Sequence, residues 1–331
     1  MELFQGKFHF DFMGRRFFFY GGSALLILAS LVSFAVKGLN YGIDFTGGTV
    51  VQVAYEKPQD IRDIRRTVAA LGHPDAVIQQ FTGSNAFTIR LKSDEKTDAS
   101  SIETFLASLQ EVSKDDPFKV EQKEFVGPAV GKHLFRQAVF AIVFSLMGII
   151  VYVAFRFSNP VWGCAGVLAL AHDVTVAFGL TSILGLEVNL VLVAAVLTLA
   201  GYSINDTIVI FDRMREKMRV LRRDPLDLVI NQSLNETFSR TIITALTVFI
   251  TVFVLLLFGG PVIRDFALIM TVGTVIGVYS TVGVAAPIIY DWEMLGRRKG
   301  SSPAPAAEPQ TKPVSAPQAP QGPKERSYRR R

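Results

Sequence analysis

The chain has 331 residues, of which 50% are hydrophobic, and its formal net charge is +5. A chain of this length and composition predicts several membrane spans and one modest soluble domain. The positive charge does not indicate nucleic-acid binding, because the basic residues lie beside apolar runs, where they act as orientation signals. The single cysteine, Cys164, excludes an intrachain disulfide and a cysteine metal site.

Six apolar runs are each close to the length that a helix needs to cross a hydrocarbon core. The first covers residues 17–36 and follows residues 1–16, whose aromatic and basic side chains suit the headgroup zone. No small-residue cleavage pattern precedes Lys37, so we interpret this run as a retained span and not as a signal peptide. The other five runs form a membrane domain within residues 134–290, at about 138–155, 161–184, 186–211, 242–258 and 266–290.

The apolar runs between residues 37 and 133 are too short to span a membrane, and strand-like and helix-like patterns alternate there. The pattern predicts strands at 49–55, 76–81, 86–91 and 118–126, and helices at 58–71 and 100–112. This β-α-β-β-α-β order is that of a ferredoxin-like unit. The predicted fold class is therefore an α-helical polytopic membrane protein with six transmembrane helices and one external α+β ferredoxin-like domain between the first and second helices.

Basic residues set the expected orientation. The predicted loop at residues 212–240 carries seven Lys or Arg and residues 291–331 carry nine, whereas the short turn at residues 185–187 carries none. Because positively charged short loops stay in the cytoplasm, both termini are expected there, with residues 37–133 outside. The Pro- and Ala-rich composition of residues 291–331 predicts a disordered basic tail.

One carboxylate, Asp206, lies inside the otherwise aliphatic run of the fourth span. An ionised acid at such a depth costs about 2.5–3.5 kcal/mol on insertion scales, so we expect a neutral form, a basic partner or a water-lined cavity. Arg240, at the start of the fifth span, is within reach, and such a pair would form a protonation switch. Two alternatives stay open: an arginine that extends to the headgroups, and an Asp206 that only holds helices together.

Two further polar residues accompany this pair. Asn205 precedes Asp206, and Asp173 follows His172 in the third span. At 1.5 Å per residue, Asp173 lies about 18 Å from the cytoplasmic boundary and Asp206 about 8 Å. Adjacent residues point to different helix faces, so the sequence does not predict a contact between His172 and Asp173. A proton relay through Asp173 is the weaker hypothesis.

The sequence lacks the patterns typical of an enzyme or of a bound cofactor. No Cys-His or carboxylate cluster has the spacing of metal ligands. Thr46-Gly47-Gly48 lacks the context of a phosphate-binding loop, which argues against ATP as the direct energy source. No Ser-His or Cys-His nucleophile set is apparent, so we expect neither enzymatic activity nor a cofactor.

Several motifs extend along most of the chain. They are residues 11–13, 42–48, 171–174, 201–213, 239–241 and 258–261. Together they resemble the SecF family, the smaller membrane subunits of bacterial SecDF complexes, within the resistance-nodulation-division superfamily. The resemblance implies that proton passage drives late steps of preprotein export across the bacterial cytoplasmic (inner) membrane, with Asp206 and Arg240 matching the acid and its basic partner. The family motif residues in this chain are Gly42, Asp44, Gly47, Gly48, Gly201, Tyr202, Asp212 and Arg213.

Six spans with one external domain are half of the twelve-span, two-domain layout of that superfamily. The resemblance therefore implies SecD as the other half. It also implies SecY, SecE and SecG of the translocon, unfolded preprotein, membrane lipids and YajC as further candidate partners, and no nucleic acid. Two other functions stay open: a proton-coupled lipid or small-molecule exporter subunit of the same superfamily, and a translocon scaffold that conducts no protons.

Overall fold

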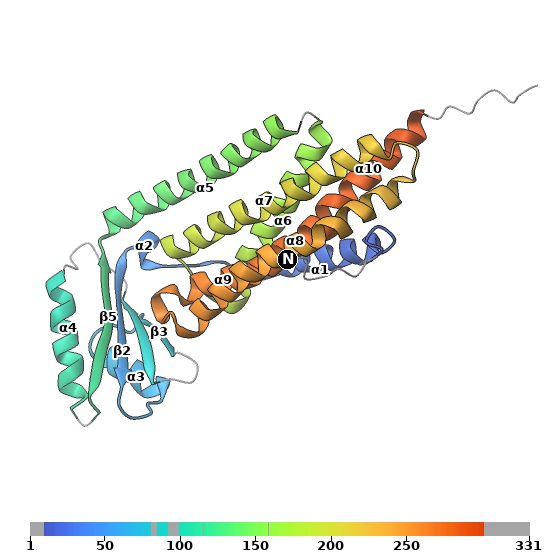
Figure 1. Cartoon of the computed structure of the whole chain (residues 1–331). Coiled ribbons are helices and arrows are strands. Elements are labelled where there is room, and N and C mark those ends of the chain that lie inside the picture. Colours follow the sequence, from blue (N-terminus) through green and yellow to red (C-terminus); the bar gives the residue numbers. More distant parts are fainter. Residues whose placement is uncertain (1–9, 81–84, 92–98, 115, 158, 301–331) are drawn as a thin grey trace, which may run out of the picture. The chain divides into compact units, whose positions relative to one another are not determined.

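The computed structural model describes residues 10–80, 85–91, 99–114, 116–157 and 159–300 (Figure 1). By its contacts the chain divides after Trp292, and the fold below is that of the first unit. Six of its described helices or helical runs are long and apolar enough to cross a membrane, which agrees with the six predicted spans. They are α1 (Arg16–Val36), α5 (Pro128–Arg156), α6 (Pro160–Leu184), α7 (Leu190–Val220), α8 (Leu226–Phe258), and a run made of α9 (Pro261–Ser280), the π-helix η1 (Thr281–Ala285) and α10 (Ala286–Gly300).

The segment between α1 and α5 contains the remaining elements except a short strand, β6 (Glu187–Val188). They are β1 (Asn40–Tyr41), α2 (Ile43–Thr46), β2 (Gly48–Tyr55), α3 (Ile61–Ala70), β3 (Val77–Gln80), β4 (Ala86–Leu91), α4 (Ala99–Val112) and β5 (Phe118–Val126). From β2 to β5 the order is β-α-β-β-α-β, as predicted. The four strands form an antiparallel sheet in the order β3-β4-β2-β5.

One face of this sheet is apolar and is covered by α3 and α4. Val51 and Val53 of β2 lie two residues apart, so their side chains point to the same face. They are fully buried, as are Phe87 of β4 and Val68 of α3. The opposite face carries polar residues such as Gln52 and is not part of this core.

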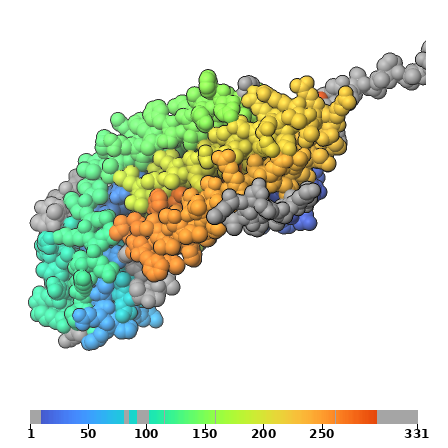
Figure 2. Space-filling model, in the orientation of Figure 1, coloured from blue at the N-terminus to red at the C-terminus, as the bar shows by residue number. Residues whose placement is uncertain are grey.

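The membrane helices differ in how much of their surface other helices cover. About half of the most apolar window is buried in α6 and in α7, but only 11% of it is buried in α5. Leu192, Val196 and Leu199 of α7 lie in the core of the helix cluster. Figure 2 shows α5, in green, as an outer layer beside α7. The centre of the membrane part is therefore formed by α6, by α7, which carries Asp206, and by the run of α9, η1 and α10, in which 67% of the most apolar window is buried.

The predicted cytoplasmic loop at residues 212–240 is mostly helical, which corrects the ends of the fourth and fifth spans. α7 continues to Val220 and α8 begins at Leu226. The extensions form a hairpin with buried apolar side chains, Met214 and Ile230 among them. Charges that marked the end of a span in the sequence pair across this hairpin, because Lys217 Nζ lies 2.7 Å from Glu236 Oε1. Because these charges are paired and the apolar side chains are buried, both helices continue beyond the predicted ends of the spans.

The α5 helix also begins earlier than predicted, at Pro128, directly after β5. At the other end of the chain, α10 extends to Gly300, so it includes the first ten residues of the segment expected to be disordered. The rest of that tail, residues 301–331, lies outside the described residues.

Residues 10–13, part of the segment expected to lie in the headgroup zone, are bound to α8. Asn231 Oδ1 accepts hydrogen bonds from the backbone N–H groups of Phe12, at 2.9 Å, and Met13, at 3.0 Å. Asn235 accepts from the N–H of Phe10 at 3.0 Å and donates to its carbonyl at 2.9 Å. Phe12 and Met13 are almost fully buried. We call Phe10–Met13 together with Asn231 and Asn235 the N-terminal clip.

Candidate functional site

Asp173 of α6 is completely buried and is held by donors from three helical segments. Ser203 Oγ of α7 donates to its Oδ2 at 2.5 Å, and Ser280 Oγ of α9 donates to the same oxygen at 2.7 Å. His172 Nδ1 lies 2.9 Å from Asp173 Oδ1. The sequence alone did not predict this contact, because adjacent residues start on different helix faces, but both side chains bend toward each other within the same buried site. Asp173 thus ties α6, α7 and α9 together.

A second pair of hydroxyls continues this polar cluster along α7. Thr207 lies one helical turn after Ser203, and its Oγ1 is 3.0 Å from Thr281 Oγ1, the first residue of the π-helix. The helices approach closely here, because a Cβ atom added to Gly277 would lie 3.3 Å from Ser203 Cβ. The wider turn of a π-helix is frequent at functional sites. A role for Ser280 or Thr281 in this cluster could not be predicted from the sequence, since a lone hydroxyl in an apolar run usually bonds its own backbone.

Asp206 lies three residues after Ser203 and has fewer partners than Asp173. Thr241 Oγ1 of α8 donates to Asp206 Oδ1 at 2.8 Å. The other oxygen, Oδ2, is buried, and no described group donates a hydrogen bond to it. The residue as a whole is half-buried. Asp206 therefore keeps one carboxylate oxygen available for a proton or for a further donor.

Arg240 lies near enough to Asp206 for its charge to act on the carboxylate, but the direct contact that the structure describes is made by another residue. Within the described residues no ion pair joins them, and the neighbouring Thr241 makes the contact instead. Consecutive residues of a helix point about 100° apart, so α8 directs buried Thr241 to α7 and leaves Arg240 exposed. Asn205 is also exposed, on the side of α7 away from Asp173. The predicted pathway residues are thus only partly brought together.

Asp173 and Asp206 lie at similar levels, which differs from the depths of about 18 Å and 8 Å derived from the sequence. Ser203 binds Asp173, and the rise from Ser203 to Asp206 is about 4.5 Å. The depths derived from the sequence took Phe211 as the end of the fourth span, whereas α7 continues to Val220.

The motif of residues 42–48 lies at the N-terminal end of α7. The Leu190 N–H donates to Asp44 Oδ2 at 2.9 Å, and the Gly42 N–H donates to the Val188 carbonyl at 3.0 Å. Gly47 has φ of 70°, a conformation that glycine adopts without strain, and Gly48 begins β2. Leu190 and Asp206 are 16 residues apart, or about 24 Å along the helix. These motif residues are therefore not part of the carboxylate site.

The remaining motif residues lie on the surface of α7. Asp212 forms an ion pair with Arg156 of α5, and Arg213 Nε donates to Glu236 Oε2 of α8 at 2.8 Å. Gly201 is exposed, with open space where a Cβ would lie, and Tyr202 is half-buried. Asp212 and Arg213 thus connect the C-terminal part of α7 to α5 and α8, a role that the sequence did not reveal.

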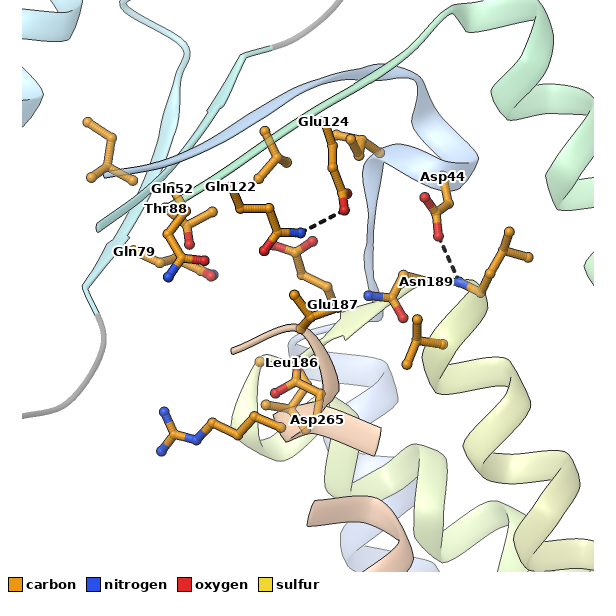
Figure 3. A pocket seen from close by; sticks show the side chains of 18 of the residues that line it. Asp44, Gln52, Gln79, Thr88, Gln122, Glu124, Leu186, Glu187, Asn189 and Asp265 are labelled. Carbon is orange, nitrogen blue, oxygen red and sulfur yellow. Dashed lines mark hydrogen bonds between the residues drawn. The ribbon is translucent and has the colours of Figure 1, made fainter. Parts of the chain in front are cut away.

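A cavity of about 1130 Å³ lies between the polar face of the sheet and the α6–α7 and α8–α9 turns. Figure 3 shows Gln52, Thr88 and Gln122 on the sheet side and Glu187 and Asn189 on the helix side. Amide side chains both donate and accept hydrogen bonds, so this lining suits polar groups such as those of a peptide backbone. Within the residues that the structure describes, no group of three or more His, Cys, Asp or Glu could hold a metal ion.

Comparison with known families gives two matches. Residues 105–295 match the family described as protein export membrane protein SecD/SecF, C-terminal. Residues 32–59 match the SecD/SecF GG motif, and this range includes Asp44, which contacts the N-terminal end of α7.

Curated relatives are similar over most of this chain. The protein translocase subunit SecF of Endomicrobium trichonymphae is 42% identical over 86% of this chain and 91% of its own length. The one from Calditerrivibrio nitroreducens is 40% identical, over 90% of this chain and 99% of its own length. The one from Escherichia coli O157:H7 is 37% identical, over 87% of this chain and 89% of its own length.

Two solved structures of SecDF are also similar. The crystal structure of SecDF, a translocon-associated membrane protein from Thermus thermophilus, has a TM-score of 0.79 and 38% identity over 89% of this chain. SecDF in a super-membrane-facing form has a TM-score of 0.67 and 37% identity over 91% of this chain. The chain spans only 40% and 41% of those two longer chains.

Proposed function

Because the chain belongs to the SecF family of protein-translocase subunits, a multi-pass membrane family of the Sec export machinery, we propose that it couples proton passage at Asp206 to late steps of preprotein translocation. SecD is the proposed other half, since the solved SecDF chains contain more than twice the length that this chain covers. SecY, SecE, SecG, YajC, membrane lipids and the unfolded preprotein are proposed as further partners. The proposed role is transport without catalytic chemistry.

The observation that carries this proposal is the incomplete hydrogen bonding of Asp206. Both oxygens of a buried carboxylate normally accept hydrogen bonds. A buried carboxylate with an unbonded oxygen is therefore a candidate functional group. Asp206 Oδ2 has no donor among the described residues, whereas Asp173, close by, has three polar partners. Asp206 is thus the carboxylate that can gain and lose a proton without breaking a bonded network.

The proposed partner face lies beside Asp206, on α7 and α8. Small or polar residues are exposed there on one stripe of each helix, where a lipid-facing surface would be apolar. The α7 stripe is Ala194, Thr198, Gly201 and Asn205, and the α8 stripe is Arg240, Thr244, Thr247 and Thr251. Such stripes allow helices of a second subunit to pack closely. In this arrangement Arg240 and Asn205 face SecD, and Arg240 pairs with Asp206 only during the transport cycle.

We further propose that the unit from β2 to β5 is a ferredoxin-like domain on the external, periplasmic side of the cytoplasmic (inner) membrane, with both termini in the cytoplasm. The element order and the antiparallel order β3-β4-β2-β5 support the domain type. The basic residues of the α7–α8 hairpin support the orientation. Protease treatment of intact and of inverted membrane vesicles checks it: cleavage within the domain only in inverted vesicles would contradict the orientation.

The test of function is Asp206→Asn, measured as preprotein export in inverted membrane vesicles with and without a proton gradient, at matched levels of complex. Asn keeps the shape and accepts the Thr241 hydrogen bond but cannot ionise. We expect assembly to be intact and the stimulation by the gradient to be lost. Stimulation at the level of the unchanged protein would contradict proton coupling and leave the scaffold function.

Arg240→Lys in the same vesicles tests the proposed basic partner. An ammonium does not reproduce the planar, bidentate contact of a guanidinium, so the stimulation should fall. The protein level should not fall, because Arg240 is exposed and makes no ion pair within the described residues. Transport of lipid or small molecules with unaffected preprotein export in both variants would favour the exporter function instead.

A further inference from the structure

The external end of α7 is attached to the sheet domain by three separate contacts. β1 pairs with β6 as a short parallel sheet, in which Asn40 lies opposite Glu187. Asp44 of α2 binds the first residue of α7, and Arg90 of β4 binds β6. We call residues 40–44 and 187–190 the α7 joint. Most of its residues lie beside the cavity between the sheet and the helices (Figure 3).

Asp44 binds α7 where the helix backbone needs an acceptor. The first N–H groups of a helix have no partner within it and carry a partial positive charge. Asn189 caps α7 by accepting from the Leu192 N–H at 2.8 Å. The Leu190 N–H is free for an outside acceptor and donates to Asp44 Oδ2 at 2.9 Å. A carboxylate from another element thus completes the cap of the helix that carries Asp206.

The third contact, between Arg90 and Glu187, joins the sheet itself to the turn before α7. The buried guanidinium of Arg90 forms an ion pair with Glu187, and its Nη1 donates to Asn40 Oδ1 at 3.3 Å. Burial lowers the pKa of Arg90, but a guanidinium stays charged at neutral pH. The buried pair therefore persists as a charged link between β4 and β6.

Close backbone packing keeps Asp44 in place. A Cβ atom added to Gly47 would lie 2.9 Å from Pro128 Cα, and one added to Gly131 would lie 2.8 Å from the Gly47 nitrogen. The short helix α2 is therefore pressed against the first turn of α5. Asp44 cannot move far without moving both α5 and the sheet that leads into it.

We propose that Asp44 is a positioning residue that transmits movement of the external domain to Asp206 through α7. An α-helix is stiff along its axis, and α7 is continuous from Leu190 past Asp206, about 24 Å away. The inference rests on the proposed function, because it assumes that the charge of Asp206 and the position of the external domain are linked.

The experiment measures the distance from the external domain to α8 by electron paramagnetic resonance. Spin labels are placed at Gln110→Cys in α4 and Leu246→Cys in α8, both exposed, in a chain with Cys164→Ser. The full chain, co-purified with SecD in lipid nanodiscs, is compared with and without Asp206→Asn, which mimics the protonated acid. With Asp44 intact, Asp206→Asn should shift the distance distribution.

Two substitutions break the Asp44 contact from opposite sides. Asp44→Ala removes the acceptor. Leu190→Pro removes the donor N–H but leaves the carboxylate, and proline is well accepted at the first position of a helix. Asn189 before it has an extended backbone, which a following proline tolerates. Both variants should lose the shift caused by Asp206→Asn, although one removes the acceptor of the hydrogen bond and the other removes its donor.

Two controls keep the contact. Asp44→Asn retains an acceptor oxygen, and Asp63→Ala removes an exposed acid of α3 in the same domain. Both should retain the shift. A shift that persists in Asp44→Ala and Leu190→Pro would overturn the role of Asp44 while the proposed function stands. A distance that Asp206→Asn never changes, even with Asp44 intact, would overturn both.

Discussion

Asp173 and Asp206 are two carboxylates of the same helix cluster, separated by about one turn of α7, yet their surroundings differ. Asp173 is fully buried and has polar partners on three helical segments. Asp206 is half-buried and has one donor, Thr241. The buried acid is the more completely bonded one, which is the pattern expected when burial of a polar group must be compensated. Asp173 therefore acts as a link between helices, and Asp206 as the group free to change.

This comparison predicts that substitutions of the two residues affect different properties of the protein. Changing Asp173 should mainly affect stability, whereas changing Asp206 should mainly affect proton-driven export. Three measurements test or refine this difference, beginning with the one for which the largest effect is expected.

Asp173→Ala should destabilise the protein by roughly 3 kcal/mol, because it leaves Ser203, Ser280 and His172 without their acceptor in a buried site. Asp206→Ala leaves only Thr241 without its acceptor, and should cost about 1 kcal/mol. Thermal unfolding of the purified complex in detergent, followed by intrinsic fluorescence, measures both.

Asp173→Asn is the matched control, because it keeps the shape and one acceptor oxygen. Its unfolding temperature should lie between those of the unchanged protein and Asp173→Ala. Equal destabilisation by Asp173→Ala and Asp206→Ala would show that the two sites do not differ in the way their contacts indicate.

Thr241→Val removes the donor to Asp206 but keeps the shape of a fully packed side chain. A hydrogen bond to a charged group contributes about 1.5 kcal/mol, so gradient-driven export should fall by up to about tenfold. Thr241→Ser retains the hydroxyl and should restore most of the rate. Export in vesicles at matched complex levels is the measurement, and full activity of Thr241→Val would mean that Asp206 does not depend on this contact.

Asp11 is exposed, so it serves as a comparison for the two carboxylates of the helix cluster. Hydrogen bonds from the Gly14 N–H and the Asn231 amide lower its pKa below the usual value of 3.8. A lowered pKa stabilises the folded state above the unfolded pKa, and this contribution disappears as the pH falls below about 3.8 through the folded pKa. Asp11→Ala should therefore lower the unfolding temperature by more at pH 7 than at pH 3.

The change for Asp11 should be small, about 2 °C or less, because the group is exposed and screened by solvent. Asp11→Asn keeps an acceptor but does not titrate, so its difference from Asp11→Ala should be the same at pH 7 and pH 3. An Asp11→Ala effect that is independent of pH would rule out the charge as its cause.

Much of the fold was predictable because its patterns are local. Long apolar runs give the helices, and the β-branched residues between 49 and 55 give the strand β2. The ends of α7 and α8 were not predictable, since Arg213 and Glu236 look like loop residues until the fold brings them together. Charged residues in a sequence indicate the end of a helix only where they do not form ion pairs with a neighbouring helix.

The candidate site was predictable in part for a similar reason. Asp206 and Asp173 are conspicuous because an acid is rare in an apolar run. The donors that distinguish them are hydroxyls 30 to 107 residues away, such as Ser280 and Thr241, and no local pattern connects them to an acid. The choice of Arg240 over Thr241 as partner depended on the rotation of α8, which a sequence does not specify.

The N-terminal clip has a consequence for the order in which the chain is assembled. Its backbone groups at Phe10, Phe12 and Met13 are synthesised first, but their partners Asn231 and Asn235 follow 218 to 225 residues later. Contacts so distant in sequence close only after the intervening chain is in place. The clip can therefore form only once the first five membrane helices have at least begun to emerge from the ribosome, and its closure is a natural marker of late biogenesis.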